Sequence, residues 1–164
     1  MKSFFVMLSA LALLTAGARA APFDQIRLTP QDIAAKPGSG AGAGTSGVTG
    51  IQTIVLLGTP TRPGPYVVEL IVPANTRIAA HTHRDNRTAV VVSGTWHFGY
   101  GRKADEARTR ALAPGSFYTE PAGAAHFAIT KAEPVSVIIT GYGPTDTIYV
   151  NAADDPRQAN QRKP

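Results

Sequence analysis

The sequence contains no cysteine among its 164 residues. That absence excludes disulfide bonds, thiolate metal ligands, a cysteine nucleophile and the lipid-modified cysteine of a lipoprotein anchor. The chain also has no G-x-S-x-G nucleophile elbow and no P-loop, and its GAGAG stretch does not lie between a strand and a helix. Thiol chemistry, serine-hydrolase chemistry and dinucleotide binding are therefore not expected.

A basic surface organised for nucleic acid is also missing. The formal net charge is +5, but the basic residues are scattered along the chain. Their densest group lies at residues 102–110, where Asp105 and Glu106 interrupt it. Nucleic-acid binding needs a basic face with aromatic or helical organisation. We therefore interpret these charges as a solvated connection and expect no nucleic-acid partner.

The longest apolar run lies at the N-terminus. Residues 1–20 combine Lys2, an apolar run from Phe4 to Ala16 and the A-x-A sequence that ends at Ala20. This pattern predicts a secretory signal peptide that is cleaved after Ala20. The alternative, an uncleaved anchor helix, requires about 20 apolar residues, which this run does not reach. We expect a periplasmic or secreted protein with no membrane attachment after cleavage.

Composition divides the chain into four parts. They are the signal peptide (1–20), a short helix with a Gly/Ser/Ala-rich linker (21–50), a barrel domain (51–150) and a C-terminal tail (151–164). Thr29 before Pro30 is typical of a helix start and predicts a helix at residues 28–36. The Gly-rich segment 37–50 has too little apolar surface to order itself. We expect this linker to be flexible and the tail to be mobile.

Residues 51–150 have the pattern of an all-β domain. Short runs rich in Val, Ile, Thr and Tyr alternate with Gly/Pro turns. The runs are IQTIVLLG (51–58), YVVELIVP (66–73), TAVVVSGTWHFGY (88–100), SFYTE (116–120), AHFAIT (125–130), VSVIITGYG (135–143) and TIYV (147–150). This spacing predicts a sandwich or barrel, with residues 101–110 as a polar connection or a short helical turn.

Three of the four histidines lie where they could share one site. On a strand, His81 and His83 point to the same face because residues i and i+2 share it. Neutral imidazoles suit Fe, Zn, Ni, Cu or Mn, although an H-x-H pair alone can also be structural or incidental. His126 strengthens the metal interpretation, because it starts another strand after a Pro-x-Gly turn. A barrel that closes around all three histidines would complete a metal site.

The same stretches resemble the two motifs of the cupin superfamily. The first motif, H-x-H followed by Glu and then Gly, is matched at His81, His83 and Gly94. The second motif, G-x5-P-x-G-x2-H-x3-N, is matched at Gly115, Pro121, Gly123 and His126, with Thr130 in place of Asn. The resemblance covers residues 51–150. It implies a small antiparallel jelly-roll barrel, a divalent metal held by the three histidines, and a homodimer that pairs through barrel edges.

Arg87 stands where the first motif has its glutamate, and this is the main departure from the family pattern. A guanidinium has no lone pair to offer a cation and stays protonated. Three interpretations remain open: a metal held by three histidines alone, a carboxylate supplied from elsewhere, or a metal-free barrel that binds an anion through Arg87. A fourth is that a strand shift or bulge turns Arg87 outward.

Asp85 and Glu120 are the carboxylates that could replace the missing ligand. Glu120 shares a strand face with Tyr118. If that face points inward, Glu120 could bind the metal, orient a histidine or pair with Arg87; otherwise it is a carboxylate at the rim. The Tyr118 hydroxyl could donate a hydrogen bond to substrate or act as an acid or base, or Tyr118 could simply fill the strand.

The remaining histidine, His97, is expected on the opposite strand face from Trp96 and Phe98, as a surface or hydrogen-bonded residue. Trp96, Phe98 and Tyr100 then form one aromatic face, which favours core packing.

The leading functional hypothesis is an exported mononuclear metalloenzyme. It would use Fe(II), with Zn, Mn, Ni or Cu as alternatives, to act as a dioxygenase-type oxidoreductase on a small oxygenated or anionic molecule; isomerase and lyase chemistry stay open. Arg87, Tyr118 and Glu120 would carry the substrate contacts and proton handling. The alternative is a non-catalytic cupin that binds a metal or a small ligand.

Overall fold

The computed structural model describes residues 25–40 and 44–161, with the side chains of 159–161 left aside. The predicted signal peptide at residues 1–20 lies outside the described residues. Among the described residues, no helix has the length and apolar character needed to cross a membrane.

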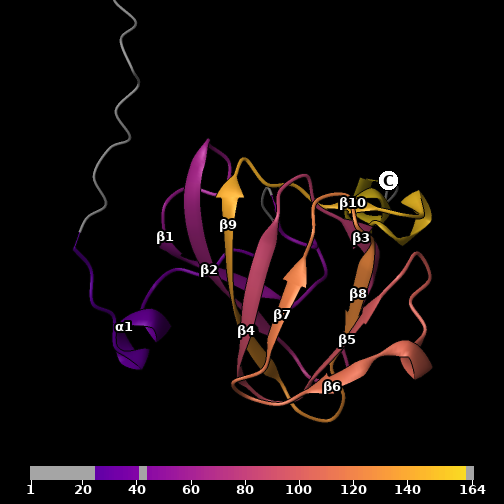
Figure 1. Cartoon of the computed structure of the whole chain (residues 1–164), viewed down its shortest axis with the longest axis horizontal. Helices are drawn as coiled ribbons and strands as arrows, with labels where there is room; N and C mark the ends of the chain where they lie inside the picture. The colour runs from indigo at the N-terminus through magenta and orange to yellow at the C-terminus, as the bar shows by residue number, and fades with distance from the viewer. Residues whose placement is uncertain (1–24, 41–43, 162–164) are drawn as a thin grey trace, which may run out of the picture.

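Ten strands form two five-stranded antiparallel sheets that face each other (Figure 1). The first sheet has the order β1-β2-β9-β4-β7 and the second has the order β10-β3-β8-β5-β6. The strands are β1 (Gln52–Leu57), β2 (Gly64–Val72), β3 (Arg77–Thr82), β4 (Arg87–Ser93), β5 (Trp96–Tyr100), β6 (Arg110–Leu112), β7 (Phe117–Glu120), β8 (His126–Ile129), β9 (Val135–Gly143) and β10 (Ile148–Tyr149). This arrangement confirms the predicted all-β jelly-roll fold.

The core lies between the two sheets and follows strand alternation. On β4, Ala89 and Val91 are buried, whereas Val90 and Val92 are exposed on the outer face. The other sheet contributes the large apolar side chains that meet them, including Trp96 and Phe98. The cluster also contains Ile51, Tyr66, Val68, Val72, Ile78, Tyr118, Ala128, Val135, Val137 and Ile139. The seven apolar runs of the sequence therefore became strands because one face of each could be buried here.

Two strands, β3 and β6, fall outside those apolar runs. β6 is short and its two outermost positions are exposed, so it carries little apolar signal. β3 is anchored through Thr130, which stands in place of the motif asparagine. The Thr130 hydroxyl donates to Pro73 O at 2.5 Å and accepts from Thr76 N at 2.8 Å. These bonds fix the turn that leads into β3.

The short helical elements agree with the predictions. Helix α1 (Pro30–Ala34) begins after Thr29, whose hydroxyl accepts from Asp32 N while the Asp32 carboxylate accepts from Thr29 N. This reciprocal pair satisfies two free donors of the first turn. The connection at 101–110 contains the single turn η1 (Glu106–Arg108).

The linker prediction is wrong for residues 44–50, which pack against the barrel. Thr45 and Ser46 are buried, and Ser46 O accepts a hydrogen bond of 2.7 Å from the Tyr149 hydroxyl. Val48 packs against the core cluster. Ser39, earlier in the same segment, exchanges two main-chain hydrogen bonds of 2.9 Å with Thr53. These contacts come from distant strands, so composition alone could not predict them.

The C-terminal segment is also ordered rather than a mobile tail up to Gln161. It forms the turn η2 (Ala152–Asp154) and the helix α2 (Pro156–Gln161) beside β10 (Figure 1). Arg157 anchors it by donating to Thr147 O at 2.8 Å, and its guanidinium carbon lies 5.9 Å from the centre of the Tyr149 ring.

Candidate metal centre

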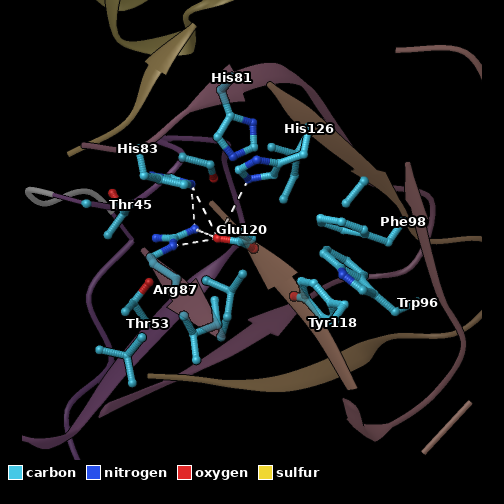
Figure 2. A pocket seen from close by; sticks show the side chains of 17 residues that line it. Thr45, Thr53, His81, His83, Arg87, Trp96, Phe98, Tyr118, Glu120 and His126 are labelled. Atoms are coloured by element: carbon cyan, nitrogen blue, oxygen red, sulfur yellow. Dashed lines mark hydrogen bonds and ion pairs between the residues drawn. The ribbon is translucent and has the colours of Figure 1, made fainter. Parts of the chain in front are cut away.

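The three predicted histidines converge inside the barrel (Figure 2). His81 lies on β3 and His83 directly follows that strand, while His126 is the first residue of β8. The β3–β8 pairing places His81 opposite His126. One ring nitrogen from each histidine lies within 4.8 Å of the other two, and all three side chains are buried. The geometry agrees with the predicted trihistidine set.

A Pro-x-Gly turn holds the third histidine against the first two. Gly123 N donates to His83 O at 2.8 Å, and Ala122 N donates to the Asn86 side chain at 2.9 Å. Gly123 has φ +71°, a left-handed conformation that glycine adopts without strain. The motif glycine therefore lets the turn fold back onto the histidine loop just before His126.

Main-chain carbonyls orient all three imidazoles. The Nδ1 atoms lie at Ala79 O (2.8 Å, from His81), Asp146 O (from His83) and Ala124 O (3.1 Å, from His126). A carbonyl only accepts hydrogen bonds, so each Nδ1 carries the proton and each Nε2 keeps its lone pair. Metal-binding histidines are commonly oriented in this way.

Burial keeps these imidazoles neutral. It lowers the pKa of His81 to about 3 and that of His126 to about 4. Burial, followed by the positive charge of Arg87, also lowers the pKa of His83 far below its usual range. The Nε2 atom of His126 is buried and has no hydrogen-bond partner among the described residues. Neutral nitrogen donors with free lone pairs fit a divalent transition metal.

Arg87 points into the barrel and pairs with Glu120. The two residues lie directly opposite each other on β4 and β7, and both side chains are buried. Arg87 Nε donates to Glu120 Oε2 at 2.5 Å, and Nη2 contacts the same oxygen. The outward orientation considered for Arg87 is therefore wrong. The carboxylate that the family pattern expects at position 87 is present one strand away, at position 120.

This ion pair lies next to the histidines (Figure 2). Glu120 Oε2 is 3.7 Å from the Nε2 atoms of both His83 and His126. Arg87 Nη2 donates to His83 Nε2 at 2.5 Å. The guanidinium thus uses the lone pair that a cation needs on His83. Full coordination by three histidines requires the end of the Arg87 side chain to move away from His83.

Asp85 does not take part in the site. Its carboxylate is buried elsewhere and accepts hydrogen bonds from the Tyr66 hydroxyl at 2.7 Å and from the Thr145 hydroxyl at 2.6 Å. Gly141 leaves room for this pair, because a Cβ atom there would lie 2.4 Å from Tyr66 Oη. Glu120 is therefore the carboxylate beside the histidines.

The histidines open onto a cavity with about 40 Å³ of free space. One wall is aromatic: the Phe98 ring lies 4.3 Å from the Tyr118 ring and 5.5 Å from the His126 ring, centre to centre. Tyr118 and Glu120 both face this cavity, as strand alternation predicted. Burial raises the pKa of Tyr118 well above its usual value, so its hydroxyl stays protonated and can donate.

The predicted aromatic face divides along β5. Trp96 and Phe98 are buried, whereas Tyr100 is 49 % exposed and donates from its hydroxyl to Thr119 O at 2.7 Å. His97 is half-buried and does not line the cavity, in agreement with the prediction. Thr53 and Ser46 do line it. Sequence reasoning missed both, because a threonine on a strand and a serine in a Gly-rich segment are ordinary.

No family model matches the sequence, and no curated protein matches it. Solved structures do match its fold. A polyketide cyclase from Streptomyces resistomycificus superposes with a TM-score of 0.65 at 18% identity, covering 84% of this chain and 94% of its own. An RmlC-like cupin from Shewanella frigidimarina gives 0.53 at 16% identity, covering 73% and 92%.

A sugar phosphate isomerase of the cupin superfamily from Silicibacter pomeroyi gives a TM-score of 0.52 at 16% identity, covering 72% of this chain and 76% of its own. The chain therefore has the cupin fold, as its motifs indicated, with a buried histidine triad that can hold a metal ion. At these identities the likeness concerns the fold.

Proposed function

We propose that this protein is an exported mononuclear metal-binding cupin that acts as a metalloenzyme on a small oxygenated or anionic molecule. The observation that carries the proposal is the convergence of three buried, neutral imidazoles, each oriented by a main-chain carbonyl. Fe(II) is our first choice of metal, and Zn, Mn, Ni and Cu suit the same donors.

A divalent metal bound there would polarise an oxygen atom of the substrate or, as iron, support dioxygenase-type oxidation. The protein's own groups would do the rest. Glu120 holds Arg87 beside the histidines, Arg87 offers a positive charge to an anionic substrate, and the Tyr118 hydroxyl offers a hydrogen bond from the aromatic wall. Trp96 and Phe98 exclude water from that side of the cavity.

Metal analysis of natively purified protein tests this proposal. The wild type should carry about one transition metal per chain, and His81→Ala and His126→Ala should lose it. His97→Ala is the matched control, because His97 lies outside the cavity, and it should keep the metal. Equally low metal in all four proteins after reconstitution would remove the metalloenzyme proposal.

Two further measurements refine the proposal. Glu120→Ala shows whether the carboxylate is a required ligand, since metal retained in this variant excludes it. Oxygen uptake by the Fe(II)-loaded protein, with His126→Ala as control, tests the dioxygenase assignment. Uptake that needs both iron and an added small oxygenated compound supports it, and its absence across such compounds directs attention to isomerase or lyase chemistry.

A non-catalytic ligand-binding cupin is the second candidate. The hydrogen bond from Arg87 Nη2 to His83 Nε2 favours it, because it occupies a metal-binding lone pair. Replacing Arg87 with methionine removes this competition. If Arg87→Met binds Zn²⁺ much more tightly than the wild type, Arg87 holds the site closed to metal. Equal affinities show that Arg87 moves aside readily.

Export and self-association complete the proposal. A mature N-terminus at Ala21 in periplasmic or secreted protein would support cleavage after Ala20. A homodimer is consistent with the exposed apolar side chains on the outer face of the first sheet, where Val90 and Phe117 lie opposite each other beside Val92. Light scattering of the purified protein would measure its mass in solution.

A further inference from the structure

Unpartnered polar atoms gather around one cavity. In the part of the chain that the structure describes, five buried side-chain nitrogen or oxygen atoms have no hydrogen-bond partner. Four belong to residues that line the histidine cavity: Thr53, Trp96, Tyr118 and His126. Only Thr147 lies outside it. Such atoms are costly to bury without a partner, so their concentration at one cavity indicates a ligand.

Two of these groups form a donor pair on the wall of the cavity. The Trp96 indole nitrogen can only donate, and the protonated Tyr118 hydroxyl can also donate. Their side chains lie beside each other, and the Tyr118 hydroxyl points toward Glu120 at the centre of the site (Figure 2). Both side chains are more than nine-tenths buried. A ligand here must therefore present acceptor oxygens to two neighbouring donors.

The charge of the site indicates that this ligand is an anion. Arg87 and Glu120 neutralise each other, and the three imidazoles are uncharged. A bound divalent cation would leave two positive charges unbalanced in a buried site, and buried charges need compensation. The free space of about 40 Å³ holds roughly three waters, given at least 10–15 Å³ for each. The ligand is thus limited to a few heavy atoms.

We propose that the cavity binds a small carboxylate of two or three carbons, whose oxygens accept hydrogen bonds from Trp96 Nε1 and Tyr118 Oη. The inference rests on the proposed function for the charge of the site, and it names the substrate class of that site. The donor pair is independent of the metal.

The single tryptophan makes the test direct. Trp96 is the only tryptophan in the chain, so ¹⁵N-labelled protein gives one indole N–H resonance that needs no further assignment. Glycolate is titrated into the full mature protein loaded with Zn²⁺. The indole proton should shift downfield in a saturable manner as its hydrogen bond forms. Glycolamide, the neutral analogue of similar size, should produce no saturable shift at the same concentrations.

Two matched variants separate a ligand contact from a structural role. Tyr118→Phe removes an unpartnered hydroxyl from the cavity wall and should weaken glycolate binding about fivefold to tenfold, the loss expected for one hydrogen bond. Thr147→Val removes an unpartnered hydroxyl outside the cavity and should leave the affinity unchanged. Equal affinities in both variants, or binding of glycolamide as tight as that of glycolate, would overturn the carboxylate site.

Failure of the metal proposal would give a different result. Zn²⁺ binding is measured first, by calorimetry, with His126→Ala as the control. If Zn²⁺ does not bind, the proposed function fails, and the glycolate titration is run on the metal-free protein. A saturable indole shift that Tyr118→Phe weakens would still support the carboxylate site, and an unmoved indole resonance would reject it.

Discussion

The barrel interior contains two clusters of buried polar side chains that differ in how their atoms are paired. Around Asp85, both carboxylate oxygens accept a hydroxyl, one from Tyr66 and one from Thr145. Around the histidines, His126 Nε2 and the Tyr118 hydroxyl have no partner among the described residues. The Asp85 cluster is closed and accounts for its own hydrogen bonds, whereas the histidine cluster needs something from outside the chain.

The two clusters also differ in what surrounds them. Gly141 lets the Tyr66 hydroxyl and the Asp85 carboxylate fill the space where a Cβ atom would lie. The histidine cluster instead borders a cavity. Both clusters are buried and both contain a carboxylate, so burial and charge do not distinguish a structural cluster from a functional one. The distinction lies in whether the buried polar atoms satisfy one another.

Acid should produce the largest difference between the clusters. The folded-state pKa values of His81, about 3, and His126, about 4, lie below the 6.5 of an unfolded histidine. Above pH 6.5 both states are neutral at these residues and stability is complete. As the pH falls from 6.5 toward 4 and 3, the unfolded chain binds protons that the folded chain refuses, so the folded state loses several kcal/mol.

Urea unfolding of chelator-treated protein between pH 7 and pH 4 would measure this loss. His126→Gln should reduce the acid sensitivity, because one of the two protonation sites is gone. His97→Gln, outside the cluster, should leave it as in the wild type. A stability that stays constant over this range would contradict the buried, neutral state of the histidines.

Breaking the Arg87–Glu120 pair should have the next largest effect. Glu120→Ala leaves the Arg87 guanidinium buried without its carboxylate, which should cost about 3–5 kcal/mol of unfolding free energy. The double variant Arg87→Met/Glu120→Leu removes both charges and should recover most of this loss. Urea titrations of the three proteins would measure both effects. A double variant no more stable than Glu120→Ala would show that the loss comes from packing rather than from the unpaired charge.

Opening the closed cluster should have a moderate effect on stability and none on ligand binding. Tyr66→Phe removes the hydroxyl that donates to Asp85 and should lower the unfolding free energy by about 1–3 kcal/mol. Zn²⁺ and glycolate affinities should match the wild type, because Tyr66 does not line the cavity. Calorimetric titrations of this variant would reveal any unexpected coupling between the two clusters.

The smallest effect on stability is expected for Tyr118→Phe. Its hydroxyl has no protein partner to lose, so the unfolding free energy should change by no more than about 0.5 kcal/mol or should rise slightly. Tyr66→Phe and Tyr118→Phe thus form a matched pair of buried tyrosine variants. A loss for Tyr118→Phe as large as that for Tyr66→Phe would place both hydroxyls in closed structural networks and remove the contrast between the clusters.

Much of the site was predictable from local patterns. The alternation of strands placed Tyr118 and Glu120 on one inward face, and the H-x-H spacing with the Pro-x-Gly-x2-His turn identified His81, His83 and His126. Strand alternation and turn geometry involve only residues close in sequence. Such features can be inferred without knowing which strands become neighbours.

The partner of Arg87 was one of several open possibilities, because Glu120 lies 33 positions away and becomes its neighbour only through the β4–β7 pairing. The same reason explains the error at residues 44–50. A Gly-rich segment has little intrinsic order, and Thr45 and Ser46 are buried only because the barrel offers them a surface. Asp85 was an equal candidate for the metal site until Tyr66 and Thr145 were found to hold it elsewhere.

The sequence by itself determined that this chain forms an all-β barrel and that it carries three histidines suited to one metal, since periodicity and motif spacing are local properties. Only the tertiary structure decided that Arg87 faces inward against Glu120, that Asp85 is structural, and that the cavity wall carries the unpartnered donors of Trp96 and Tyr118. Whether a buried polar atom has a partner depends on residues brought together from distant strands, and that is a property of the assembled barrel alone.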